Sequence, residues 1–137
     1  MVNTGPRWPR VLAALLGFLG VAAGAFGAHG IRGLVAPEQL QTWETAADYQ
    51  LLHAVALLAV SGWQQSTPSS RLQFWLLWAC GLIAAGILLF SGSLYLLVLT
   101  NISAFGPITP IGGLALLGGW LILLACGLII RGGDVAP

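Results

Sequence analysis

Charged side chains are scarce in this sequence. Only 7% of its 137 residues are Asp, Glu, Lys or Arg, and lysine is absent. An ordinary soluble domain carries roughly 25% charged residues, so water is not the main solvent of this surface. The five basic residues form no basic run and the net charge is +1. These features exclude the electrostatic footprint of a nucleic-acid-binding protein, and we expect no nucleic acid among its partners.

Cysteine and histidine are also rare. Cys80 and Cys126 lie inside apolar stretches and form no CxxC motif, which excludes a disulfide framework and a zinc knuckle. His29 and His53 fall at depths that differ by roughly 13 Å at the rise of an α-helix, so they cannot ligate one centre within a chain. The sequence therefore predicts no metal site and no cofactor.

Apolar sequence is what the chain has in excess. Hydrophobic residues make up 58% of it, and they gather in four segments. Because about 20 apolar residues span a bilayer core, we predict an all-α fold, an integral membrane four-helix bundle. Residues 1–137 form a single transmembrane domain with helices at about residues 10–29, 37–63, 72–100 and 110–130.

The segments differ in character. The first could instead be a cleaved signal peptide, but three further apolar segments already require the membrane. The second is the least hydrophobic and begins at Pro37, a residue suited to a first helical turn. The third is long, and Ser91 to Ser93 suggest a tilt, a kink or a late exit there. Thr109 is expected to cap the last helix before Pro110.

Arginine positions predict the orientation. With four spans, the side that holds both termini carries Arg7, Arg10, Arg71 and Arg131, whereas the other side carries Arg32 alone. Cytoplasmic loops are enriched in basic residues, so both termini are expected in the cytoplasm.

Small residues recur along two helices. They are spaced to line helix faces, and GxxxG-type surfaces let helix backbones approach closely in lipid. They could pack the bundle internally or form a seam between copies of the chain. The candidate packing residues are Gly17, Gly20, Gly24, Gly27, Gly112 and Gly119.

Polar residues gather in the half of the membrane away from the cytoplasm. We predict a ligand-binding or proton-responsive cluster of His29, Glu44, Asp48 and Ser91, because acids within membrane helices usually face the protein interior or water. The alternative is that Glu44 and Asp48 are ordinary interfacial charges. His53 lies one turn from Tyr49, and we expect these two side chains to form interhelical hydrogen bonds.

Four ordered motifs carry a family resemblance: GAFGAHG at residues 24–30, ETAADYQLLH at 44–53, LFSGSLYLL at 89–97 and ITPIGG at 108–113. With them the chain resembles the YgdD/YwdK-type family of small uncharacterised bacterial inner-membrane proteins, which has small eukaryotic transmembrane relatives. The resemblance covers about residues 11–130. It implies a multi-pass inner-membrane protein with a retained first helix, and it supplies no reaction and no established site. Ala36 stands where the family commonly has a polar cap.

Three functions remain open. The first is a non-enzymatic membrane protein that acts through helix contacts, as a homo-oligomer or as an accessory subunit of a membrane-protein partner. The second is a proton or small-solute carrier that uses the outer acidic cluster. The third is a membrane enzyme with Ser91 as nucleophile. The sequence contains no GxSxG, HExxH or phosphate-binding loop, so an enzyme is the least favoured of the three functions and we assign no catalytic residue.

Overall fold

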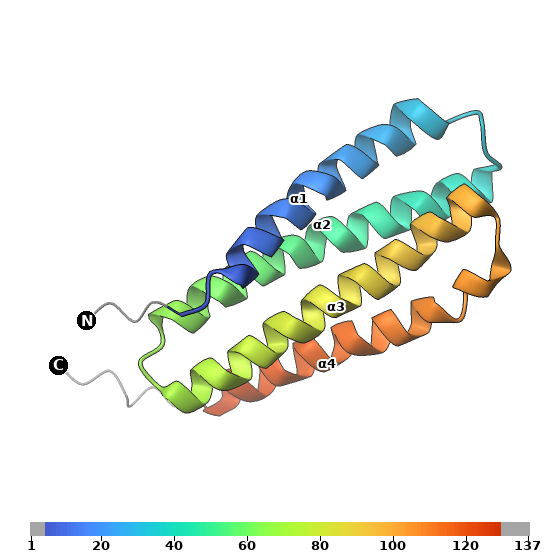
Figure 1. Ribbon diagram of the computed structural model, residues 1–137. Coiled ribbons are helices and arrows are strands. Elements are labelled where there is room, and N and C mark those ends of the chain that lie inside the picture. Colours follow the sequence, from blue (N-terminus) through green and yellow to red (C-terminus); the bar gives the residue numbers. More distant parts are fainter. Residues whose placement is uncertain (1–4, 130–137) are drawn as a thin grey trace.

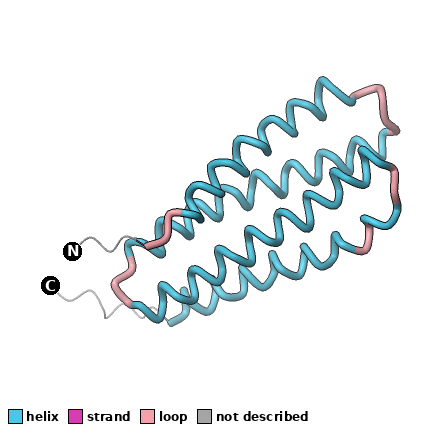
Figure 2. Tube along the Cα trace, viewed as in Figure 1, coloured by secondary structure: helices cyan, strands magenta, loops and turns pink. Residues whose placement is uncertain are grey.

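The computed structural model describes residues 5–129 (Figure 1). Four helices, α1 (Trp8–Ala25), α2 (Pro37–Ser66), α3 (Ser70–Thr100) and α4 (Ile108–Ile129), follow one another along the chain. A π-helix, η1 (Phe26–Ile31), continues α1, and a 3-10 turn, η2 (Ser103–Phe105), precedes α4. The described residues contain no strand (Figure 2). The predicted all-α four-helix architecture is confirmed, while Arg131 lies outside the described residues.

One helix start differs from expectation, and one stretch expected to interrupt a helix does not. α4 begins at Ile108, so Thr109 lies within the first turn and is not the cap. Pro110 is tolerated there because the first N–H groups of a helix lack partners in any case. α3 runs through Ser91 to Ser93 as an unbroken α-helix. The Ser93 hydroxyl donates to the Phe90 carbonyl oxygen at 3.0 Å and lies 2.7 Å from the Thr109 hydroxyl oxygen, so it bonds within its own helix and across to α4.

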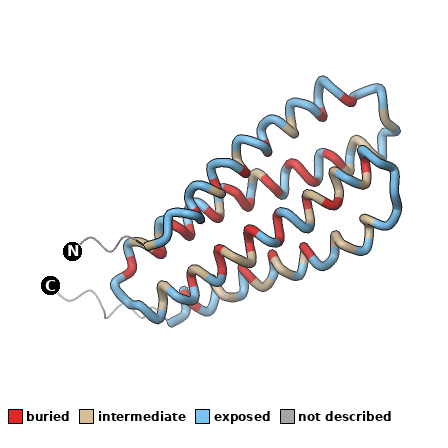
Figure 3. Tube along the Cα trace, in the orientation of Figure 1, coloured by how far each residue is buried: buried red, intermediate tan, exposed pale blue. Residues whose placement is uncertain are grey.

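The helices pack in chain order. α1 lies on α2, α2 on α3 and α3 on α4, so α1 and α4 are the outer helices (Figure 1). The main core runs across all four helices, through residues such as Leu16, Leu57, Ile83 and Leu116. Buried positions follow the facing sides of the helices, and the outer sides of α1 and α4 are exposed (Figure 3). The first residue of α1 and the last described residue of α4 lie at the same end.

Three helical segments are long and apolar enough to cross a membrane: Trp8–Ile31, Ser70–Thr100 and Ser103–Ile129. α2 is the exception, because polar residues crowd its first half. It lies between α1 and α3, and this placement shelters polar side chains such as Gln50 and His53 from lipid. At 1.5 Å per residue its 30 residues measure about 45 Å, which is longer than a bilayer core.

Glycine brings α3 and α4 together. A Cβ atom added to Gly112 would overlap the backbone of Leu89 and Phe90, and one added to Gly119 would lie 2.8 Å from Ile83 Cγ1. On α3, a Cβ atom at Gly86 would lie 2.5 Å from Leu116 Cδ2. Close backbone approach supplies the dispersion contacts that hold helices together where lipid removes the hydrophobic driving force. α3 and α4 are therefore the most closely packed pair of helices.

Candidate functional site

Gln50 joins three helices in the buried interior. Its Nε2 donates to the carbonyl oxygen of Leu16 in α1 at 2.8 Å, and its Oε1 accepts from the Tyr95 hydroxyl in α3 at 2.9 Å. The side chain is 5% exposed. Both ends of the amide are thus satisfied, which an apolar environment demands of a buried polar group. The arrangement fixes α1 and α3 against α2.

Trp43 lies two helical turns before Gln50 on α2 and makes a second link to α1. Its indole Nε1 donates to the carbonyl oxygen of Ala23 at 2.8 Å. The ring packs between Phe26 and Tyr95, with centroid distances of 5.5 and 4.5 Å. Gly27 makes room for it, because an added Cβ atom there would lie 2.7 Å from Trp43 Cδ1. The π-helical end of α1 therefore packs closely against this tryptophan, and a side chain larger than glycine at position 27 would overlap it.

His53 links α2 to α4. Its Nδ1 lies 2.7 Å from the Tyr49 carbonyl oxygen and its Nε2 lies 3.2 Å from the indole Nε1 of Trp120. A carbonyl oxygen only accepts and an indole N–H only donates, so these partners select the neutral tautomer with the proton on Nδ1. Every hydrogen-bonding atom of the buried ring is used. The geometry leaves no lone pair free for a metal ion.

Tyr49 takes part through its ring. The ring stacks on Phe90 of α3 at a centroid distance of 4.5 Å and on His53 at 5.7 Å. Among the hydrogen bonds found within residues 5–129, the Tyr49 hydroxyl makes none, whereas Tyr95 has one. Of the two residues predicted to form interhelical hydrogen bonds, His53 does so through its ring, while in the described residues the tyrosine hydroxyl that bonds to another helix is that of Tyr95.

The four residues of the predicted ligand cluster do not share one environment. His29, Glu44 and Asp48 are exposed, while Ser91 is 1% exposed. The Ser91 hydroxyl is buried without a hydrogen-bond partner. No group of three or more metal-ligating side chains occurs in the part of the chain that the structure describes. The charged residues therefore mark the outer surface of this end of the bundle.

The six candidate packing glycines fall into two sets. Gly20 and Gly27 face α2, since added Cβ atoms would lie 2.8 Å from Leu51 Cδ2 and 2.7 Å from Trp43 Cδ1, and Gly112 and Gly119 face α3. Gly17 and Gly24 have nothing within 4 Å of an added Cβ atom. The GxxxG pair of Gly20 and Gly24 is thus divided between a packed face and an open one.

Sequence reasoning missed several residues of the interior network. Gln50 and Tyr95 lie within two of the four family motifs without an assigned role, and Trp43, Gly86 and Trp120 gave no signal. Trp120 lies in the middle of an apolar helix, where an interfacial tryptophan is not expected. That position could have indicated a buried hydrogen-bond acceptor on a neighbouring helix, because an indole N–H in lipid requires one.

These features define a small helical membrane protein whose polar interior links α2 to each of the other helices. A family profile described as "Protein of unknown function (DUF423)" matches residues 23–113. The chain belongs to this family.

Relatives support the assignment. A UPF0382 membrane protein of Staphylococcus aureus (strain bovine RF122) is 46% identical over 114 residues, covering 83% of this chain and 89% of the relative. The UPF0382 membrane protein of Staphylococcus haemolyticus is 42% identical with the same coverage. The UPF0382 membrane protein YwdK of Bacillus subtilis is 38% identical over 121 residues, 83% of this chain and 90% of the relative. Solved structures give no significant match. The resemblance to a YwdK-type membrane family of unknown function is confirmed.

Proposed function

We propose that this protein acts through helix–helix contacts in the membrane, as a homo-oligomer or as an accessory subunit of a larger membrane assembly. The observation that carries the proposal is the open glycine face of α1, formed by Gly17 and Gly24. No atom of another helix lies within 4 Å of a Cβ atom added at either position. In lipid, small residues on an unoccupied helix face allow a further helix to approach closely.

The position of α1 supports the same reading. It is an outer helix that packs chiefly on α2, and it exposes Val11, Phe18 and Val21 by 66%, 72% and 64%. Gly17 and Gly24 lie seven residues apart, so they share a face at 3.6 residues per turn. A second helix laid along this face would contact backbone at two levels, two turns apart.

Leucine substitutions distinguish the open glycine face of α1 from its packed face at Gly20. In Gly17→Leu, Gly24→Leu double-variant protein, the new side chains project into open space, so the chain should fold while association falls about tenfold or more. Ala22→Leu is the matched control, because Ala22 is exposed and lies roughly 140° to 160° around the helix from the two glycines. Gly20→Leu should instead impair folding, since its side chain would overlap Leu51.

Association is measured with two differently tagged copies in one membrane, captured through the first tag in mild detergent and detected through the second. Partner proteins are compared by quantitative mass spectrometry between wild type, the Gly17→Leu, Gly24→Leu double variant and the Ala22→Leu control. A wild-type chain that is monomeric in detergent and in lipid, and whose partners are unchanged in the double variant, contradicts the proposal.

Location follows the same proposal. We place the protein in the bacterial inner membrane as a multi-pass protein with both termini in the cytoplasm, on the arginine distribution and the membrane-protein relatives. Its immediate partner is the lipid bilayer. The carrier alternative has less support, because the buried polar residues of α2 after His53 are the uncharged Ser61 and Gln64, and the core around them is apolar. The enzyme alternative lacks an activated nucleophile, since no base contacts the Ser91 hydroxyl.

A further inference from the structure

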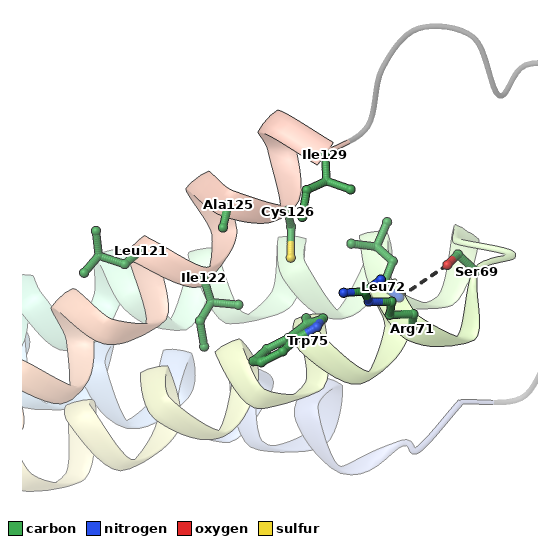
Figure 4. A pocket seen from close by; sticks show the side chains of 9 residues that line it. All are labelled: Ser69, Arg71, Leu72, Trp75, Leu121, Ile122, Ala125, Cys126 and Ile129. Atoms are coloured by element: carbon green, nitrogen blue, oxygen red, sulfur yellow. Dashed lines mark hydrogen bonds between the residues drawn. The ribbon is translucent and has the colours of Figure 1, made fainter.

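A groove separates the start of α3 from the end of α4. It has a volume of about 630 Å³. Figure 4 shows its two walls, with Leu72 and Trp75 on α3 facing apolar residues of α4. Leu121 lies at one end of the groove, and Ser69 and Arg71 lie at the other. The α4 wall consists of Leu121, Ile122, Ala125, Cys126 and Ile129.

The polar residues that line the groove lie only at the end where α3 begins and the described part of α4 stops. α3 begins at Ser70, so Ser69 and Arg71 lie at the depth of the lipid headgroups if α3 crosses the membrane. Trp75 and Trp78, one and two turns further, are 43% and 55% exposed. Tryptophans at this depth are typical of the membrane interface. The apolar part of the groove then runs along the acyl chains, and its polar mouth faces the phosphates.

Charge at the mouth comes from arginine. The Arg71 guanidinium lines the groove, and it is the only charged side chain among the described residues that line it. The three acidic residues of the described segment are Glu38, Glu44 and Asp48, in the first half of α2. Asp48 is 18 residues before the end of α2 at Ser66, about 27 Å along the axis. No acidic side chain of the described segment therefore neutralises this mouth.

We propose that this groove binds an anionic phospholipid, with the phosphate at Arg71 and an acyl chain between α3 and α4. Arginine pairs with phosphate through two parallel N–H groups, which combines charge with fixed geometry. A neutral lipid offers the same acyl chains without the net negative charge. The preference for anionic lipid is therefore the property that separates this site from an ordinary lipid-facing seam, and it does not depend on the proposed α1 interface.

The test uses the full chain purified in neutral detergent, with phosphatidylglycerol or phosphatidylcholine added and bound lipid counted by native mass spectrometry. Wild type should retain phosphatidylglycerol at least fivefold better than phosphatidylcholine. Arg71→Gln should remove most of this preference, whereas Arg10→Gln should keep it, because Arg10 is exposed on α1 and does not line the groove. Glycerol phosphate should not compete, since it lacks the acyl chain.

A second variant checks the apolar half of the site. Ala125→Trp places a large side chain on the groove wall and should lower retention of both lipids while the helix content stays unchanged. Equal retention of the two lipids by wild type, or an unchanged preference in Arg71→Gln protein, overturns the proposal. Competition by glycerol phosphate would reassign the mouth to a free anion and overturn it as well.

Discussion

Gly112→Ala protein is expected to lose about 2 kcal/mol of unfolding free energy, because overpacking at a fully packed site typically costs 1–3 kcal/mol. The added Cβ atom would overlap the backbone of Leu89 and Phe90. A side chain could rotate away from such an overlap, but a helix backbone can only move as a whole. α3 and α4 would have to separate along their length, which weakens the contacts at Gly86 and Gly119 as well.

Gly113→Ala is the matched control for this change. Gly113 is the next residue of α4, and an added Cβ atom there would lie 3.8 Å from Phe90 Cδ2, which is ordinary contact. Alanine is favoured over glycine in a helix by about 1 kcal/mol, so this variant should be as stable as wild type or more so. Unfolding of both is followed by circular dichroism in mixed micelles. Equal stabilities of the two variants would show that α3 and α4 do not meet at Gly112.

Gln50→Leu is the second large change, and we expect it to lower the unfolding free energy by about 2 kcal/mol, within the range for a buried polar group deprived of its partner. The substitution removes the bonds to the Leu16 carbonyl oxygen and to the Tyr95 hydroxyl. Leucine nearly preserves the volume, so the loss reports the hydrogen bonds and the partner left unsatisfied. Unfolding in mixed micelles gives the free energy.

The two tyrosines of the chain provide the control for this network. Tyr95→Phe should cost about 1 kcal/mol in wild type and little in the Gln50→Leu background, because both changes break the same bond. Tyr49→Phe should be neutral, since the Tyr49 ring stacks on Phe90 and its hydroxyl makes no bond within residues 5–129. Additive effects of Gln50→Leu and Tyr95→Phe would rule out the bond between them.

The helices could be predicted from the sequence because their signal is simple. Long apolar runs punctuated by proline and arginine placed all four within a few residues of their observed bounds. The ends were less predictable, since Ser69 and Pro107 lie in segments where apolar periodicity fades. The Ser91 to Ser93 stretch does not interrupt α3, because a serine hydroxyl in a helix can bond to a carbonyl oxygen of the preceding turn, as that of Ser93 does.

The interior polar network was harder to predict. Hydropathy identifies polar residues in apolar segments, but it does not say which helix face each one occupies. At their positions in α2, Gln50 and His53 face neighbouring helices, whereas Glu44 and Asp48 face outward. The depth of each polar residue along its helix axis was therefore predictable, but the neighbouring helix that its side chain contacts was not. The same limit applies to the glycines, since only the packing of α1 on α2 distinguishes Gly20 from Gly24.

The fold depends on α2, because its buried polar residues Gln50 and His53 are sheltered from lipid only if α2 crosses the bilayer between α1 and α3. Cysteine labelling tests this directly, since Cys80 and Cys126 are buried and should stay silent. Single cysteines are introduced as Leu34→Cys before α2 and Pro68→Cys after it, at two exposed positions, and a membrane-impermeant maleimide is added to intact spheroplasts. We predict labelling at position 34 before lysis and at position 68 only after it. Labelling of both positions from the same side would contradict the four-span topology.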